Sequence, residues 1–253
     1  MIKKDMVVKI TLIAVALILF LSAAVWLLIP KREEVIIPED VAKPLLTMLS
    51  TEYTYNVVEK GKKFKNIAII KKTGNNYQFK STEKRGNQKD IVVDAKLNVN
   101  YETLEWKLDN PRKNIKVTAV RSGNKIILSG TFEQKQNNKR EIYIDDRKWL
   151  QVYQLGVMKF AASGKKDTSF EFWSLNPDDP GSAMVLFATN KGPETMNIDG
   201  VKIKTARLKI GLAGIMSMFW TGDYWFRVPE GVFVKAKISG DMAVLLKGEK
   251  KKK

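Results

Sequence analysis

The stretch Thr51–Val57, TEYTYNV, indicates the fold class. From Tyr53 to Val57 an aromatic or β-branched residue occupies every second position, and polar residues stand between them. A period of two is typical of a strand with one buried face, because successive side chains point to opposite sides of a sheet. Similar segments recur down the chain between turn sequences such as Gly74-Asn75-Asn76, at intervals of about 8 to 12 residues. We therefore predict a mainly β fold, an antiparallel meander curled into a half-barrel or open barrel.

The segment Trp149–Ala162, WLQVYQLGVMKFAA, breaks this pattern. Its apolar residues are too dense for simple alternation, which predicts one short helical or irregular buried segment. The strands that we expect on either side of it cover residues 51–57, 67–70, 77–81, 91–99, 101–108, 115–120, 126–132, 141–144, 169–173, 183–188, 196–199, 201–212, 216–220, 224–228 and 232–238.

The N-terminus carries a second strong signal. From Ile10 to Ile29 the chain has no charged residue, and 20 helical residues span about 30 Å, the hydrocarbon thickness of a bilayer. Lysines precede this run, so the positive-inside rule predicts a cytoplasmic N-terminus and a periplasmic body. A cleaved signal peptide with a cut after Ala24 is the alternative, but the sequence VWLLIP that follows would extend the apolar segment.

These signals divide the chain into four parts. We expect a signal-anchor transmembrane helix at residues 1–30, a linker at 31–50, an extracytoplasmic β domain at 51–246 and a basic tail at 247–253. The expected location is the inner (cytoplasmic) membrane, which the chain crosses once, with the C-terminal domain in the periplasm.

Composition argues against catalysis. The chain contains neither histidine nor cysteine, which excludes Ser-His-Asp and Cys-His centres, thiolate metal sites and most zinc sites. We therefore predict no enzyme activity, no cofactor and no metal. Two adjacent acid pairs, Asp145-Asp146 and Asp178-Asp179, could serve a carboxylate-dependent hydrolase or bind calcium. Their turn-like contexts are more typical of loop caps.

The charge of the body favours anionic partners. The net charge is +17, and residues 1–30 carry three lysines and one aspartate, so the rest carries +15. Such a body attracts lipid head groups, acidic polymers and acidic protein faces. Nucleic acid is not expected, because the anchor places the body outside the cytoplasm. A lysine-rich surface that only aids solubility is the alternative.

The second half of the chain contains an ordered series of aromatic and turn motifs: Phe172-Trp173, Ile198-Asp199-Gly200, Ile203-Lys204-Thr205, Phe219-Trp220 followed by Tyr224-Trp225-Phe226, and Gly231-Val-Phe-Val-Lys235. This order resembles a broad family of uncharacterised bacterial exported or membrane-anchored domains, in which an antiparallel sheet curls around a short helical segment. A more distant similarity is to periplasmic half-barrel lipoprotein carriers, which implies a concave sheet that shelters acyl chains. Those carriers are lipid-anchored through a cysteine that this chain lacks.

The densest aromatic cluster supplies the candidate site. We expect Trp220, Tyr224, Trp225 and Phe226 to include a ligand or partner face, because strand alternation sends Trp220 and Trp225 to different sides. The alternative is that the cluster belongs to the core.

These observations predict a non-enzymatic, membrane-anchored binding or assembly component of the cell envelope. It would engage a protein partner in an envelope complex, with an anionic lipid or acyl chain as a further partner. A lipid or lipoprotein carrier with a concave cleft and a hydrolase of envelope polysaccharide are the two alternatives.

Overall fold

The computed structural model of the protein describes residues 49–251, except 199, 215–216, 218–219 and 240–241. The predicted anchor and most of the linker lie outside these residues. Within the described ranges no helix has the length and apolar character needed to cross a bilayer.

The described strands form one antiparallel sheet of fourteen, which confirms the predicted fold class. The first eight are β1 (Thr51–Glu59), β2 (Lys62–Thr73), β3 (Asn76–Lys84), β4 (Ile91–Leu97), β5 (Thr103–Asn110), β6 (Ile115–Ser122), β7 (Lys125–Phe132) and β8 (Lys135–Tyr143). The others are β9 (Ser169–Asn176), β10 (Asp179–Ile198), β11 (Val201–Leu212), β12 (Thr221–Arg227), β13 (Val232–Ile238) and β14 (Met242–Lys251).

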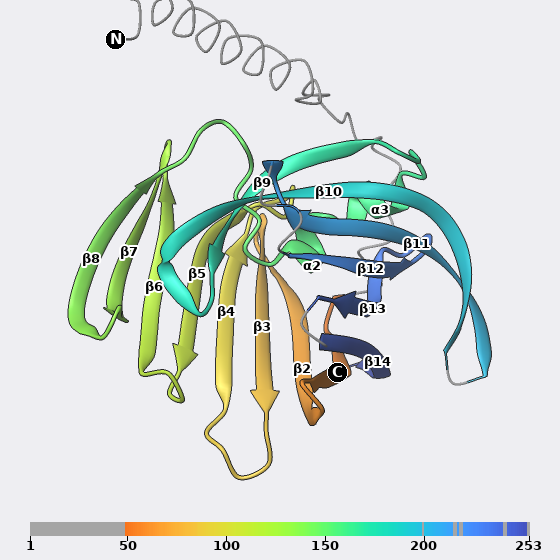
Figure 1. Cartoon of the computed structure of the whole chain (residues 1–253), viewed down its shortest axis with the longest axis horizontal. Helices are drawn as coiled ribbons and strands as arrows, with labels where there is room; N and C mark the ends of the chain where they lie inside the picture. Colours follow the sequence, from red (N-terminus) through yellow and green to blue (C-terminus); the bar gives the residue numbers. More distant parts are fainter. Residues whose placement is uncertain (1–48, 199, 215–216, 218–219, 240–241, 252–253) are drawn as a thin grey trace, which may run out of the picture. The chain divides into compact units, whose positions relative to one another are not determined.

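The strand order shows two meanders, β1–β8 and β9–β14, which are joined at the centre of the sheet. The order runs from β8 down to β1, then from β14 down to β9, so β1 pairs with β14 and the two edge strands are β8 and β9. Figure 1 shows the sheet curving so that its two halves face each other across a hollow. The sheet is open, in agreement with the predicted half-barrel or open barrel.

The segment between β8 and β9 fills the hollow. It contains two short helices, α2 (Tyr153–Gly156) and α3 (Met158–Ala162), which confirms the predicted short helical segment. Figure 1 places them between the β2–β8 half and the β9–β14 half of the sheet. Their apolar side chains join those of the inner sheet face, and the segment's members of this core are Trp149, Leu150, Val152, Leu155, Val157, Met158, Phe160 and Ala161.

A short stretch of the same segment covers the free edge of β9. Trp149 forms a parallel bridge with Trp173, and Leu150 N donates to the carbonyl oxygen of Trp173 at 2.9 Å. On its other side the stretch bonds β5, since Thr103 N donates to the Trp149 carbonyl oxygen at 2.9 Å. Residues 148–151, the strap, thus bond both β5 and β9 and satisfy backbone groups that an open edge would expose.

Several elements differ from the sequence-based boundaries, among them β2 and β8, which begin earlier than the predicted strands 67–70 and 141–144. β14 extends to Lys251 and pairs with β1 as far as Thr51, so most of the predicted basic tail is strand. The sequence did not predict this strand end, because lysines stand where the apolar alternation of a strand would be expected. The predicted strands 183–188 and 196–199 belong to the single long β10. Most of the predicted strand 216–220 lies outside the described residues.

The acid pair Asp145-Asp146 lies beside the strap. The Asp145 carboxylate accepts hydrogen bonds from Arg147 Nε at 2.9 Å and from Trp173 Nε1 at 2.9 Å. The hydrogen bond from Arg147 is the main reason that the pKa of Asp145 lies well below its usual value. Asp145 therefore helps to hold the strap against β9.

We expect Trp149→Ala to destabilise the fold strongly. The Trp149 side chain is fully buried, and truncation of a buried tryptophan typically lowers the free energy of unfolding by about 3–5 kcal/mol. Tyr143→Ala is the matched control, because Tyr143 is 69% exposed and its loss should change stability by less than about 0.5 kcal/mol. Urea denaturation followed by far-UV circular dichroism measures both, and equal midpoints for the two variants would contradict the role given to the strap.

We expect the stabilising effect of Asp145 to depend on pH. A carboxyl whose pKa is depressed in the folded state contributes stability above its unfolded pKa of about 3.9, and loses it as the pH falls through the folded pKa. Asp145→Asn should thus lower the melting temperature at pH 7, and the difference from the parent protein should shrink as the pH falls below about 4. A difference that stays constant down to pH 2 would show that the carboxylate charge is not the cause.

Candidate binding cleft at the β10–β11 hairpin

Three of the predicted site residues lie on β12, on opposite faces of the sheet. Tyr224 and Phe226 are 1% and 0% exposed and belong to the core. The Tyr224 hydroxyl lies 3.2 Å from that of Tyr153 on α2, so this pair ties the helical segment to β12. Burial raises the pKa of Tyr224 and of Tyr153, which keeps both hydroxyls neutral and able to donate.

The indole of Trp225 points to the other face. Its Nε1 donates to the Glu194 carboxylate on β10, and the Lys235 ammonium lies 5.2 Å from the ring centroid. These neighbours leave Trp225 only 7% exposed. Trp220 is half-buried just before β12, and Phe219 lies outside the described residues. A binding role for the cluster stays a prediction, although Tyr224 and Phe226 present almost no surface to a partner.

The paired acids do not converge on a common groove. Asp145 binds Arg147, and Asp178 pairs with Lys113 at 2.8 Å. Among the described residues, no group of three or more acidic side chains is placed to hold a metal ion.

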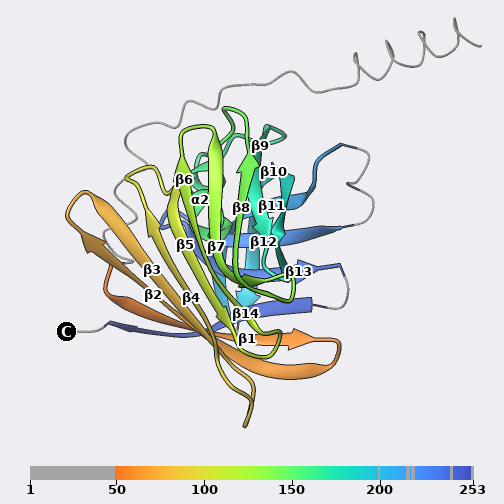
Figure 2. The ribbon, with the colours of Figure 1, turned by 90° about the vertical axis from the view of Figure 1, so that its left-hand side faces the viewer.

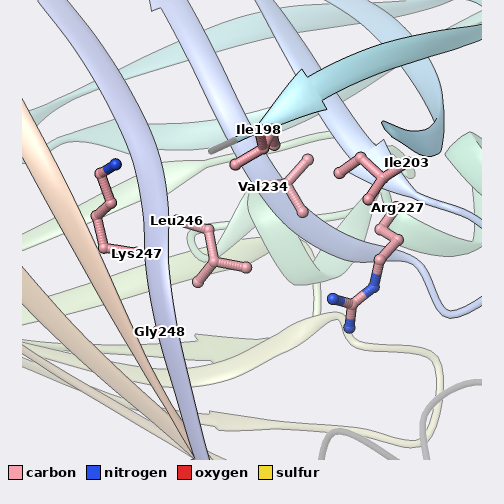
Figure 3. A pocket seen from close by; sticks show the side chains of 7 residues that line it. All are labelled: Ile198, Ile203, Arg227, Val234, Leu246, Lys247 and Gly248. Carbon is pink, nitrogen blue, oxygen red and sulfur yellow. The ribbon is translucent and has the colours of Figure 1, made fainter. Parts of the chain in front are cut away.

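A cleft of about 310 Å³ lies beside β12, and the sequence did not point to it. Figure 3 shows its lining residues, which come from the far end of the β10–β11 hairpin and from β12, β13 and β14: Ile198, Ile203, Arg227, Val234, Leu246, Lys247 and Gly248. This volume is at the lower end of the range of about 300–1,000 Å³ for ligand sites.

The cleft combines apolar walls with positive charge. Ile198 and Ile203 on the hairpin, together with Val234 and Leu246 on β13 and β14, provide four aliphatic side chains. Arg227 and Lys247 are the charged members of the lining, and no acid is among them. Arg227 also pairs with an acid outside the lining, since its Nε lies 3.6 Å from Glu230 Oε2. The site can therefore hold an apolar group next to an anionic one.

The β10–β11 register brings the hairpin residues to the cleft. Met196 stands opposite Ile203 and Ile198 opposite Val201, so these apolar residues share one face of the hairpin. The alternation around the Gly200 turn was visible in the sequence. The proximity of Arg227, Val234 and Leu246 was not, because it depends on the curvature of the whole sheet.

Comparison with known proteins gives a likeness of fold. No protein-family model matches the chain, and no curated protein matches its sequence. A solved β-barrel-like protein of the domain of unknown function DUF1849 from Brucella abortus is similar, with a TM-score of 0.56 and 9% identity. The match covers 81% of this chain and 99% of that one.

Two further solved proteins match more loosely. The hypothetical lipoprotein YmcC from Escherichia coli gives a TM-score of 0.38 and 12% identity over 81% of this chain and 88% of its own. A putative exported protein with a YmcC-like fold from Bacteroides fragilis gives 0.31 and 11% over 80% and 96%. The predicted resemblance to uncharacterised bacterial antiparallel β domains is confirmed: the protein is similar in fold to such domains.

Proposed function

We propose that the protein is a non-enzymatic, extracytoplasmic binding component of the cell envelope, and that it holds the apolar part of an anionic amphiphile in the cleft of Figure 3. The observation that carries this proposal is the lining of the cleft, where four aliphatic side chains stand on the same side of β14 as Arg227, while Lys247 extends from the other side of that strand. The apolar run Ile10–Ile29 supports the location, since it predicts an anchor that leaves the body outside the cytoplasm.

The chemistry of the lining sets the class of ligand. Burial of apolar surface yields about 25 cal/mol per Å², or about 0.8 kcal/mol for each methylene group. A single acyl chain gains this free energy of burial without needing a hydrogen-bond partner inside the cleft. A carboxylate or phosphate at one end of that chain gains charge-assisted bonds from a guanidinium or an ammonium group. Arg227 and Lys247 provide one of each.

The filled interior of the sheet favours a ligand site at the margin of the sheet over one inside the hollow. A carrier with a concave cleft needs an empty hollow, and here Trp149–Ala162 fills it with side chains that are mostly under 6% exposed. A ligand in the hollow would have to displace Val157, Met158 and Phe160, and their burial would be lost. The concave-cleft carrier is therefore less well supported than a margin site.

The hydrolase alternative lacks a similar observation. One carboxylate of each acid pair that could serve it is ion-paired, Asp145 with Arg147 and Asp178 with Lys113, and none of the four acids lines the cleft.

We expect the cleft to bind saturated fatty acids with a chain-length dependence. Each added methylene should strengthen binding about fourfold, from about 0.8 kcal/mol per buried methylene, until the cleft is full. Matched alcohols should bind more weakly, because they lack the charge that faces Arg227 and Lys247. Native mass spectrometry of the intact chain in a nonionic detergent, with fatty acids of increasing length, measures the bound fraction.

The control compares a tryptophan substitution inside the cleft with one outside it. Ile198→Trp fills the space that the acyl chain would occupy and should abolish binding. Val120→Trp adds the same group at an exposed position of β6 and should leave binding unchanged. The proposal fails if Ile198→Trp binds as the parent protein does, or if alcohols and acids of one length bind equally.

A further inference from the structure

The end of the β10–β11 hairpin is a ribbon of only two strands. β11 pairs with β12 from Thr205 to Gly211, whereas it pairs with β10 as far as Val201. Toward the turn from Thr205, a backbone hydrogen bond of 3.1 Å from Val228 N to the Lys204 carbonyl oxygen still ties the ribbon to the chain that follows β12. Figure 1 shows these two long strands arching past the others to a separate tip. A ribbon of two strands has little stability of its own.

The two faces of this tip have opposite character. Its apolar face carries the cross-strand pairs Met196–Ile203 and Ile198–Val201. Its polar face carries Thr195–Lys204 and Asn197–Lys202. Both lysines are exposed, and among the described residues neither forms an ion pair. The tip, defined as residues 195–198 and 201–204, is therefore an amphipathic ribbon with free positive charge.

The apolar face is incompletely covered. Ile198 and Ile203 line the cleft, but Val201 at the end of the ribbon is 62% exposed. Large exposed apolar side chains elsewhere in the described residues, such as Val99, Val120 and Tyr143, do not border the cleft. At Val201, exposed apolar surface, an apolar cleft and unpaired lysines coincide.

We propose that this tip inserts into the surface of an anionic lipid bilayer, with Val201 among the acyl chains and Lys202 and Lys204 at the phosphate level. Lysine side chains can extend from an apolar surface to bring their ammonium groups to lipid phosphates. The cleft then lies next to the bilayer, which supplies its amphiphile. This last point rests on the proposed function, whereas insertion of the tip does not.

A bilayer fits these observations better than a protein partner does. The apolar surface is narrow, and Lys202 and Lys204 beside it outnumber the one acid of the turn, Asp199, so the net charge of this sequence suits a sheet of anionic head groups. The sequence also predicts that the anchor holds the chain at a membrane, and the 18 residues from Lys31 to Met48 can span at most about 60 Å.

A single label at the tip tests the proposal. The chain has no cysteine, so Val201→Cys can be labelled alone with the fluorophore NBD in the full chain. After reconstitution into nanodiscs that contain phosphatidylglycerol, the NBD emission should shift to the blue, and lipids with a doxyl group on the acyl chain should quench it. The control is Tyr143→Cys at the edge strand β8, where the same label should stay in water.

Charge reversal tests the role of the lysines. In the labelled Val201→Cys protein, Lys202→Glu with Lys204→Glu should lower the ratio of inserted to free label about thirtyfold or more, from the loss of two lysine–surface attractions. Lys139→Glu on β8 should leave it unchanged. Equal emission from the Val201 and Tyr143 labels in anionic nanodiscs would overturn the proposal, as would insertion that is the same in phosphatidylcholine nanodiscs.

The two proposals can fail separately. Fatty-acid binding in detergent does not need a bilayer, so an uninserted tip with a ligand-binding cleft would reject only the insertion. An inserted tip on a protein whose cleft binds no fatty acid would reject only the ligand.

Discussion

The burial of Trp149–Ala162 against the inner face of the sheet is the interaction on which the rest of the structure depends. An open antiparallel sheet of this size presents an apolar concave face, and that face must be covered because its exposure costs about 25 cal/mol per Å². Here one connecting segment covers it, with Trp149, Val157 and Phe160 at 1% exposure or less. The same segment supplies the strap that bonds β5 and β9, so one stretch of chain fills the hollow and covers an edge.

With this arrangement the described cleft lies at the margin of the sheet. With the hollow filled, the described cleft lies where β10 and β11 extend beyond the end of β12. Their extra length carries Ile198 and Ile203 over Val234 and Leu246, and it leaves a cleft because no third strand fills the space. Figure 2 shows the strands of the two halves from the side, with β14 alongside β1 where the two meanders join. The cleft borders this junction, since Leu246 pairs with Tyr55 across it.

The sequence predicted the fold class because its strongest signals are local. Alternation at Tyr53 and Tyr55, turn residues between strands and the dense apolar run at Trp149 each act within a few residues. β14 was missed because its end is lysine-rich and is held by pairing with β1, a contact nearly two hundred residues away. The candidate binding site was harder to predict from the sequence than the fold. Tyr224 and Phe226 are aromatic as a binding face would be, but the curvature of the sheet buries both in the core, where Tyr224 packs against Tyr153 of α2. The cleft combines strands that no local pattern connects.

The amphipathic tip also results from strands that extend beyond their neighbours. In a strand with a third neighbour, Ile203 and Val201 would pack against that neighbour, and Lys202 and Lys204 would face water. Without one, the ribbon keeps the alternation but has no partner for half of its apolar face. Within the described residues nothing covers Val201, and the charges beside it indicate what kind of surface would suit it. Two lysines with no acid partner among the described residues oppose a second basic body of this kind and favour an anionic one. Since the cleft opens beneath the same ribbon, one surface can supply both the cover for Val201 and the ligand for Ile198 and Ile203.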